Sequence, residues 1–463
     1  MEKWEQKLKN NFGSAVVDKK AALENEIEDF PRYVSEYLLG YFCDDGVTQQ
    51  NLKQMNNYIK DCKVESREKE KARHKLQTNY RMKIIDKYKV EINLTNENKR
   101  ENNLNIPSMG IEKAQVYNSI LKENERLLID GLWGLGELKY DPEEKVIELI
   151  KFKPFQLANI NIENFKEARN DFDLNEWINI LISTIGLNYK SYSRRAKLIL
   201  ISRLLSMVEN NLFLMEFGPP GTGKTYAFEN LSSYSRVISG SKVTPAQLFY
   251  NLNTKQDGLL LQYDVILFDE IDKVKGRGID ENVVNKLYQY LASGKFDRGG
   301  VEKNSNCGIM MVGNLPKGEL DKKAILSKLL PDNLKHDAFL DRLRGVIPGW
   351  ELEPIKDSDV SLTKHFGFTA DYFSEILNLL RRSNFNYILN RIELINASIR
   401  DEQAIKKIIS GFIKLLYPNG EISDDQLSEI INYAIEYRQF VVNQNYYINK
   451  KEEFNKIIDY KLL

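Results

Sequence analysis

Apolar and polar positions along the chain follow different periods, and the pattern changes near residues 160 and 350. Residues 1 to about 105 are polar and rich in Lys, Glu and Asn, with a helical cluster of apolar positions at 33–39. From 131 to 155, short alternating apolar runs flank Asp141–Pro142, which predicts a β-hairpin. We therefore expect residues 1–160 to form an α+β amino-terminal domain.

The middle of the chain combines helical periodicity with short buried strands. Residues 161–210 predict helices, and strand-like apolar runs follow at 212–217, 235–239, 263–268 and 308–313, separated by helical stretches. This alternation is typical of a parallel α/β sheet. Beyond Trp350 the pattern predicts helix after helix and no strand. We therefore expect an α/β core over 161–350 and a helical lid over 351–463.

The composition is that of a soluble protein with several domains. The chain has 463 residues, 42% of them apolar, and its 66 Lys and Arg balance 66 Asp and Glu, so overall charge predicts no particular partner. The three cysteines are far apart, which fits a reducing compartment and argues against zinc ribbons or a disulfide framework. The charged start and the lack of an apolar run of about eighteen residues predict a cytoplasmic protein without membrane contact.

A glycine-rich run follows the first strand of the core. It consists of Gly218, Pro219, Pro220, Gly221, Thr222, Gly223, Lys224 and Thr225. Strand, loop and helix start come in the order of a P-loop, whose backbone N–H groups surround phosphates. Lys224 is expected to reach the β- and γ-phosphates of ATP, and the Thr225 hydroxyl to bind Mg²⁺. A chance glycine-rich turn is the alternative, but the coincidence of loop, Lys-Thr pair and flanking strand favours a P-loop.

Polar side chains end two further strands of the core. Asp269 and Glu270 follow the buried run 265–268, at the sheet edge where ligands of open α/β sheets bind. Asp269 is expected in the Mg²⁺ shell and Glu270 as the general base that polarises the attacking water. Asn314 ends the 308–313 run and fits a position that orients this water. The alternatives are an acidic strand end without a role and a simple Asn turn. The set predicts Mg²⁺-dependent ATP hydrolysis.

A locally basic stretch lies in the amino-terminal domain. Residues 63–89 hold ten Lys and Arg against four Asp and Glu, although the whole chain is neutral. Such a run is typical of a solvated helix face. The same charges can instead contact the phosphates of a nucleic acid. Both interpretations stay open.

The chain resembles the Lon-like ATPases of bacterial BREX phage-defence systems, which are of the AAA+ type. The resemblance is carried in the core by 218–225, 269–270, 291–299 and 312–314, and elsewhere by 36–40, 131–133, 140–142, 176–178 and 400–418. It covers nearly the whole chain. Members of this family usually carry a carboxy-terminal protease-like domain. Because the sequence stops soon after the lid, we expect neither that domain nor peptidase activity.

The resemblance implies a ring of identical subunits, a hexamer or stacked hexamers, that engages DNA and works with other defence-system proteins. In AAA+ proteins a hairpin at 292–303 faces the central pore, which would bring Arg298 and Lys303 to a threaded polymer; a solvated surface hairpin is the alternative. Arg342 is expected to act on the γ-phosphate of the neighbouring subunit, with Arg344 as its competitor and a plain intrachain ion pair as the alternative. Arg400, at the start of a lid helix, is expected near the nucleotide as a second sensor.

Three functions are compatible with these residues. The first is a DNA motor in phage defence, and the second is a remodeller that threads polypeptide. The third is a nucleotide-gated assembly that binds DNA with ATP and turns over slowly, without stimulation by DNA. Lys and Arg in the pore would favour DNA and aromatic residues would favour polypeptide; Phe249, Tyr250 and Lys255 leave this undecided.

Overall fold

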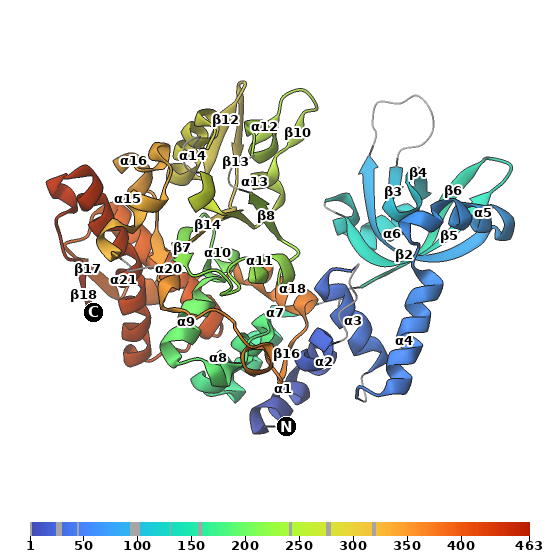
Figure 1. The fold of residues 1–463 in the computed structure, drawn as a ribbon, viewed down its shortest axis with the longest axis horizontal. Helices are drawn as coiled ribbons and strands as arrows, with labels where there is room; N and C mark the ends of the chain where they lie inside the picture. Colours follow the sequence, from blue (N-terminus) through green and yellow to red (C-terminus); the bar gives the residue numbers. More distant parts are fainter. Residues whose placement is uncertain are drawn as a thin grey trace. The chain divides into compact units, whose positions relative to one another are not determined.

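The chain divides into two units in the computed structural model, which describes residues 2–24, 30–43, 46–92, 102–129, 131–155, 160–239, 243–274, 279–316 and 321–463. One unit is 21–158, and the other is 1–20 together with 159–463 (Figure 1). The first twenty residues therefore belong to the larger unit, and the predicted domain 1–160 differs from this division. The reason is a long-range pairing, because β1 (Val16–Asp18) runs antiparallel to β16 (Phe366–Phe368) of the lid.

The smaller unit is a five-stranded barrel with helices packed on it. Its strands are β2 (Arg81–Ile92), β3 (Asn102–Ile106), β4 (Ile111–Val116), β5 (Leu132–Asp141) and β6 (Val146–Pro154). Its helices are α3 (Arg32–Phe42), α4 (Gln49–Cys62), α5 (Lys69–Asn79) and α6 (Asn118–Glu123), with short turns η2 (Ser66–Glu68), η3 (Pro107–Met109) and η4 (Glu125–Leu128). The barrel closes in the order β2-β3-β4-β6-β5, with β4 and β6 parallel and the other pairs antiparallel. This is the architecture of the OB-fold. The predicted hairpin is confirmed as β5 and β6.

A glycine on β5 makes room for an aromatic side chain inside the barrel. Tyr88 of β2 is fully buried, and its hydroxyl donates a hydrogen bond to the Ile84 carbonyl oxygen at 2.9 Å. A Cβ atom at Gly136 would lie 2.3 Å from that hydroxyl oxygen. Glycine therefore lets Tyr88 fill the interior, where a larger residue would displace it.

The larger unit is built on a five-stranded parallel sheet. Its strands are β7 (Phe213–Gly218), β8 (Ser235–Ser239), β11 (Val265–Asp269), β14 (Gly308–Asn314) and β15 (Gly345–Ile347), in the order β15-β7-β14-β11-β8. The four predicted strands are confirmed. β15 was missed because three residues are too few for a period-two pattern. The central strands β7, β14 and β11 are buried over almost their full length, so their carboxyl ends meet at one protected edge.

Further elements lie before the lid in the larger unit, and the helix at 19–24 continues from it into the smaller unit. They are α1 (Lys3–Phe12), η1 (Gly13–Ala15), α2 (Lys19–Glu24), α7 (Ile162–Ala168), η5 (Arg169–Asp171), α8 (Leu174–Ile185), η6 (Tyr189–Ser191), α9 (Arg194–Ser202), α10 (Leu205–Val208), α11 (Tyr226–Asn230), α12 (Pro245–Leu248), β9 (Tyr250–Asn251), β10 (Gln256–Asp257), α13 (Leu259–Gln262), η7 (Ile271–Val274), α14 (Glu281–Ser293), β12 (Lys295–Arg298), β13 (Val301–Asn304), η8 (Lys322–Ala324), α15 (Ile325–Leu329), η9 (Asp332–Leu334), α16 (Asp337–Leu340) and η10 (Gly349–Glu351). The predicted hairpin at 292–303 is confirmed as β12 and β13, turning at Gly299 and Gly300 with φ values of 61° and 79°. It stands beside the β9–β10 hairpin (Figure 1).

The lid contains strands as well as helices, so the prediction of helices alone beyond Trp350 is wrong. Its helices are α17 (Ser358–Ser361), α18 (Ala370–Leu380), α19 (Asn386–Leu389), α20 (Ile399–Leu416), α21 (Asp424–Asn449) and η11 (Glu452–Phe454). Besides β16, the strands β17 (Ile392–Ile395) and β18 (Asp459–Leu462) pair antiparallel. Each strand has three or four residues, too few to produce a signal in the sequence. Among the described residues, no helix combines the length and apolarity that a membrane crossing requires.

Candidate nucleotide-binding site

The loop after β7 has the backbone of a phosphate-binding loop. Gly221 and Gly223 have φ values of 79° and 70°, in the left-handed region that glycine enters at little cost. Lys224 is buried behind the loop, where its Nζ donates to the carbonyl oxygens of Pro219 at 2.7 Å and Gly218 at 3.2 Å. The loop thus curls around its own lysine. Its ammonium is the cation that phosphates would meet there.

The predicted amide at the end of β14 lies against this lysine. Asn314 Oδ1 accepts a hydrogen bond from Lys224 Nζ at 3.0 Å, and the Asn314 N–H donates to Asp272 at 2.8 Å. Burial lowers the pKa of the Lys224 ammonium, while the nearby Glu216 carboxylate acts in the opposite direction. The structure therefore brings Asn314 and the P-loop together as predicted. Asp272, which fixes the Asn314 backbone, was missed.

The two residues predicted to hold Mg²⁺ are in contact. Thr225 Oγ1 donates to Asp269 Oδ2 at 3.0 Å, and Asp269 Oδ1 accepts from the Glu270 N–H at 2.7 Å. Hydroxyl and carboxylate oxygens are the ligands that Mg²⁺ prefers, and it usually takes only one or two from the protein. These residues therefore fit the ion. Aligned ends of β7 and β11 bring them together, since β14 lies between the two strands in register with both.

Glu270 has an unusual backbone for its type. Its φ is 56°, a left-handed value that costs a non-glycine residue free energy and tends to persist at functional sites. Its side chain is 45% exposed and forms an ion pair with Lys273. The carboxylate that was predicted as the general base therefore reaches solvent at the carboxyl edge, with one cation as its partner.

A buried ion pair contacts the P-loop on its inner side, and this pair was not predicted from the sequence. Arg203 and Glu216 are 2% and 0% exposed, and two hydrogen bonds of 2.9 and 2.7 Å join them side by side. Arg203 Nη1 also donates to the Thr222 carbonyl oxygen at 2.9 Å. Glu216 is the one charged residue of the otherwise apolar β7. A lone charge in such a strand signals a buried partner, which is the clue that was available.

The segment after η10 covers the front of the loop. The Ile355 N–H donates to the Gly221 carbonyl oxygen at 2.9 Å. A side chain at Gly221 would meet the Pro354 ring at 3.8 Å. The start of the lid therefore contacts the P-loop directly. No sequence motif predicted this contact.

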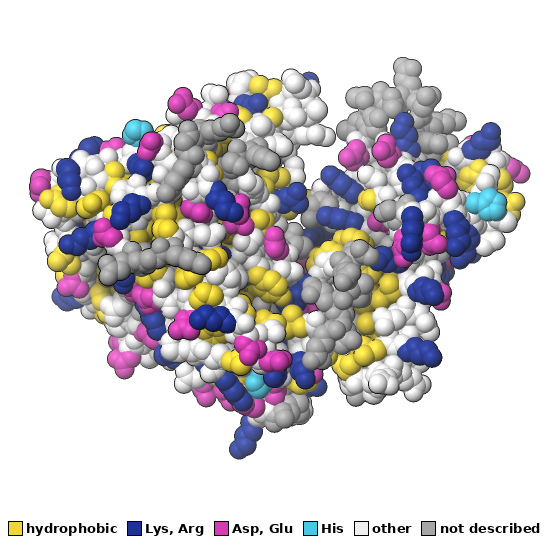
Figure 2. All heavy atoms as spheres, viewed as in Figure 1, with side chains coloured by type: hydrophobic (Ala, Val, Ile, Leu, Met, Phe, Trp, Pro, Cys, Tyr) yellow, Lys and Arg dark blue, Asp and Glu magenta, His cyan; other side chains and the backbone are white. Residues whose placement is uncertain are grey.

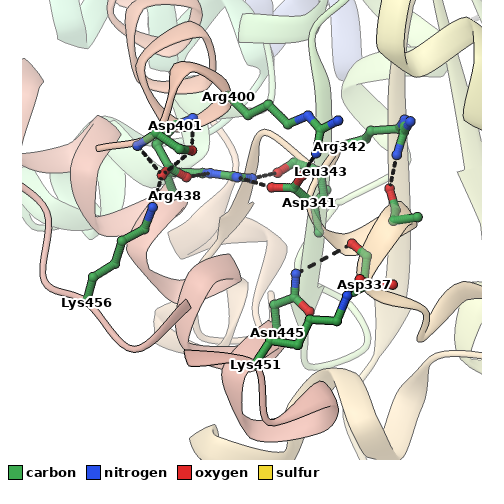
Figure 3. A network of polar contacts seen from close by, with 12 residues as sticks. Asp337, Asp341, Arg342, Leu343, Arg400, Asp401, Arg438, Asn445, Lys451 and Lys456 are labelled. Carbon is green, nitrogen blue, oxygen red and sulfur yellow. Dashed lines mark hydrogen bonds and ion pairs between the residues drawn. The ribbon is translucent and has the colours of Figure 1, made fainter. Parts of the chain in front are cut away.

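Three predicted arginines lie at the amino end of the parallel sheet, away from the P-loop: Arg342, Arg344 and Arg400. Arg344 is 8% exposed and its N–H donates to the Phe213 carbonyl oxygen at the start of β7. Arg342, two residues earlier, is half-buried, and Arg400 pairs with the Asp341 carboxylate (Figure 3). The P-loop begins at the other end of β7, so Arg400 does not lie beside the P-loop of its own chain, and its role as a second sensor stays a prediction. The intrachain partners of Asp341 are Arg400 and Arg438, not Arg342.

The parallel sheet, the P-loop and the polar side chains at its edge together define a P-loop ATPase domain. The chain belongs to the BrxL-like family of BREX systems. The family model described as "Lon-like protease BrxL-like, ATPase domain" matches residues 147–458. That described as "BREX system Lon protease-like protein BrxL N-terminal" matches residues 10–140. The family predicted from the motifs is therefore confirmed.

Two curated relatives are similar over almost the whole chain. The Lon-like protease BrxL of Escherichia coli is 32% identical over 449 residues, 94% of this chain and 64% of the relative. That of Bacillus cereus is 32% identical over 452 residues, 95% of this chain and 66% of the relative. The chain thus spans just under two thirds of the length of these relatives. Among solved structures, a full-length MCM homologue from Methanopyrus kandleri has a TM-score of 0.44 at 11% identity, over 78% of each chain.

Proposed function

We propose that this chain is an ATP-hydrolysing motor of BREX-type phage defence, which assembles as a ring of identical subunits and engages DNA. The observation that carries the proposal is the placement of charges on the sheet. Lys224, Asn314, Asp269 and Glu270 meet at the carboxyl edge, while the arginines stand at the amino edge. A ring in which one edge faces the other would complete a site between neighbouring subunits. The proposed assembly is a hexamer or stacked hexamers.

The residues of the carboxyl edge would divide the work of hydrolysis. When bound, Mg²⁺ neutralises charge on the triphosphate that is to be cleaved. Thr225 and Asp269 would hold the ion. Lys224 would exchange its three oxygen partners for phosphate oxygens, which frees the Asn314 amide to orient a water molecule. Glu270 would accept the proton of that water, and Arg342 of the neighbouring subunit would stabilise the charge that develops on the γ-phosphate.

The barrel supports DNA as a partner. OB-folds bind oligonucleotides through their faces and loops, and Lys and Arg side chains lie close together over the smaller unit on the face drawn in Figure 2. Part of the basic stretch 63–89 is neutralised locally, since Arg67, Lys71 and Arg73 pair with Glu65, Glu68 and Glu70. Within the described residues, Lys75, Lys83 and Lys89 form no ion pair. These three lysines are the proposed phosphate contacts.

A second candidate function, the threading of polypeptide, is favoured by the paired hairpins. Arg298 donates to the Tyr250 carbonyl oxygen, and Lys303 pairs with Asp257 at 3.2 Å, so both cations are engaged by the β9–β10 hairpin. Leu252, at the tip of that hairpin, is 43% exposed. Because both cations are already engaged, the hairpins would offer few free charges to a phosphate backbone, and the exposed Leu252 would offer an apolar contact to an unfolded polypeptide.

ATP hydrolysis by the purified protein tests the proposal, measured without polymer, with double-stranded DNA and with an unfolded polypeptide, at low and moderate salt. Stimulation by DNA that fades with salt is the expected result, because phosphate contacts release counterions. Stimulation by polypeptide alone would instead establish the remodeller. Slow hydrolysis that neither polymer changes, in a protein that binds DNA only with ATP, would establish a nucleotide-gated assembly. A ring that hydrolyses no ATP would overturn the proposal, and Lys224→Ala serves as the control for contaminating activity.

A further inference from the structure

A cavity lies in the smaller unit, beside the connection from α4 to α5. Its volume is about 530 Å³, within the range of about 300–1,000 Å³ that is typical of small-molecule sites. Its walls come from this connection, from β2, from η3 and from the start of β5. An isolated parallel bridge between Lys63 and Ile85 holds the connection against β2. All the lining residues belong to the smaller unit, so the cavity contains no residue of the P-loop site.

A buried carboxylate forms one wall of the cavity. Asp86 of β2 is 4% exposed. Its Oδ2 accepts hydrogen bonds from the Ser108 N–H at 2.9 Å and from the Ser108 hydroxyl at 2.7 Å, and its Oδ1 accepts one from the Lys87 N–H at 2.7 Å. A carboxylate has about four acceptor positions. Within the described part of the chain these contacts leave one position open, on Oδ1, for a donor from a ligand.

Two aromatic rings form a second wall. Trp133 and Phe30 meet edge to face, with their ring centroids 5.4 Å apart. Trp133 is half-buried, so part of its ring stays accessible, and Val64 and Ile85 add apolar surface beside it. Nucleobases stack on aromatic side chains of this kind because every base has a flat π-face. This wall therefore suits a planar ring.

Two cations belong to the connection that borders the cavity. The Lys63 ammonium lies 5.4 Å from the centre of the Phe30 ring. Arg67 is 83% exposed and forms an ion pair with Glu65 at 2.8 Å. Exposed pairs of this type contribute little free energy, so a phosphate can compete with Glu65 for the guanidinium.

The charges of the cavity select among ligands. A simple cation would suit Asp86 and the rings, but Lys63 and Arg67 would repel it. A simple anion would suit these two cations, but Asp86 would repel it. A nucleotide carries a flat ring, N–H donors and a phosphate at separate points, and it therefore matches all three walls.

We propose that this cavity binds a nucleotide whose base carries an exocyclic amino group. The base would stack on Trp133, the amino group would donate to Asp86, and the phosphate would contact Lys63 and Arg67. Cytosine, adenine and guanine have this amino group, whereas thymine and uracil present one N–H between two carbonyl oxygens, which a carboxylate repels. The nucleotide is either free or an unpaired residue of a strand, because a base inside a duplex is stacked on both sides. The proposal goes beyond the proposed function and does not depend on ATP hydrolysis.

Calorimetric titration of the full chain tests the proposal. The Lys224→Ala background removes most nucleotide binding at the P-loop, and the probes are deoxycytidine and thymidine monophosphates and short single strands of each. A cytidine probe should bind about 10-fold more tightly than its thymidine counterpart, because only cytosine satisfies the carboxylate. Preference for the monophosphate would identify a free nucleotide, and preference seen only with the strand would identify a nucleic acid; both results support the site. Equal affinity for cytidine and thymidine probes, or no binding of any probe, would overturn the proposal.

Variants of the cavity locate the binding. Trp133→Ala should weaken cytidine binding by about 10-fold. Asp86→Asn should remove the preference for cytidine over thymidine, since an amide can donate to a thymine carbonyl, and loss of the fold would weaken both probes alike. Arg67→Ala should weaken both probes, whereas Arg382→Ala, which removes an exposed arginine of the larger unit, should change neither. An unchanged preference in Asp86→Asn would place the binding elsewhere and overturn the proposal. A chain that hydrolyses no ATP but keeps this preference would overturn the proposed function alone.

Discussion

The two edges of the parallel sheet are built in opposite ways. At the carboxyl edge, the P-loop is one continuous run of residues whose carbonyl oxygens enclose its own Lys224. The amino edge is made from side chains of the core and of two lid helices, which meet at Asp341. The lid meets the P-loop through its first residues, at Ile355, whereas its two long helices supply side chains to the amino edge. The first edge should therefore control ATP binding, and the second should control the rate of hydrolysis.

Replacing the lysine of the carboxyl edge should have the largest effect on ATP binding. Hydrogen bonds to charged groups are worth about 1.5–3 kcal/mol each, so Lys224→Ala should weaken ATP binding by about 100-fold or more. Titration with a fluorescent ATP analogue measures this, with Arg382→Ala as the control variant. Wild-type affinity in Lys224→Ala would show that the carboxyl edge is not the nucleotide site.

Replacing the arginine of the amino edge should leave binding intact. Arginine fingers of related enzymes contribute about 10³-fold or more in rate, so Arg342→Ala should bind ATP with wild-type affinity and lose about that factor in kcat. Arg344→Ala should chiefly lower stability, because Arg344 is 8% exposed and lies inside the fold. Steady-state kinetics and thermal melts of both variants distinguish these effects. Full activity in Arg342→Ala, with loss in Arg344→Ala, would move the finger to Arg344.

Glu270→Gln should stop hydrolysis after binding at the carboxyl edge. General bases contribute about 10²–10⁴-fold, and Gln has the same size, so ATP should stay bound and uncleaved. Single-turnover assays and analysis of the retained nucleotide measure the effect. Glutamine also removes the ion pair with Lys273, so Lys273→Met, which breaks the same pair and keeps the carboxylate, is the matched control. Unchanged turnover in Glu270→Gln would remove this residue from the role of base.

The sequence was informative where a site is local and less so where it depends on distant contacts. The P-loop and the polar residues that end β11 and β14 could be predicted because each comes at the end of a short apolar strand. The parallel sheet predicted Asn314 at the same edge as the P-loop, and the structure shows its side chain in contact with Lys224. The catalytic roles of these residues stay predictions. The pair of Asp341 with Arg400 joins residues 59 apart in the chain, and no local pattern predicts such a contact.

The buried ion pair of Arg203 with Glu216 should affect the stability of the fold as well as catalysis. Arg203→Met would leave the Glu216 carboxylate buried without a cation, and breaking a buried pair in this way costs about 3–5 kcal/mol. The free energy of unfolding of the larger unit, from urea titration, should fall by that amount. Replacing both residues, as Arg203→Met with Glu216→Leu, should restore part of it because no charge stays uncompensated. A loss below about 1 kcal/mol in the single variant would show that the pair is not buried in solution.

The smallest expected effect concerns the carboxylate that anchors the arginine edge. Burial alone would raise the pKa of Asp401, but the nearby Arg438 and Lys456 outweigh it and lower this pKa to about 2. Because the folded pKa lies below the unfolded value, the ion pairs stabilise the fold at neutral pH. This stability should be lost as the pH falls from about 4 towards 2 and Asp401 takes up a proton.

Asp401→Asn should remove this pH-dependent part, which amounts to about 2 kcal/mol for a shift of this size. The difference in unfolding free energy between wild type and Asp401→Asn should therefore be largest above about pH 4 and shrink as the pH falls. Urea titrations across this range measure it, and Asp359→Asn, which changes an exposed carboxylate that forms no ion pair among the described residues, is the control. A difference that stayed constant with pH would mean that packing and neutral hydrogen bonds hold the lid helices to the core. The stability of the amino edge would then depend on charge no more than the stability of the P-loop backbone does.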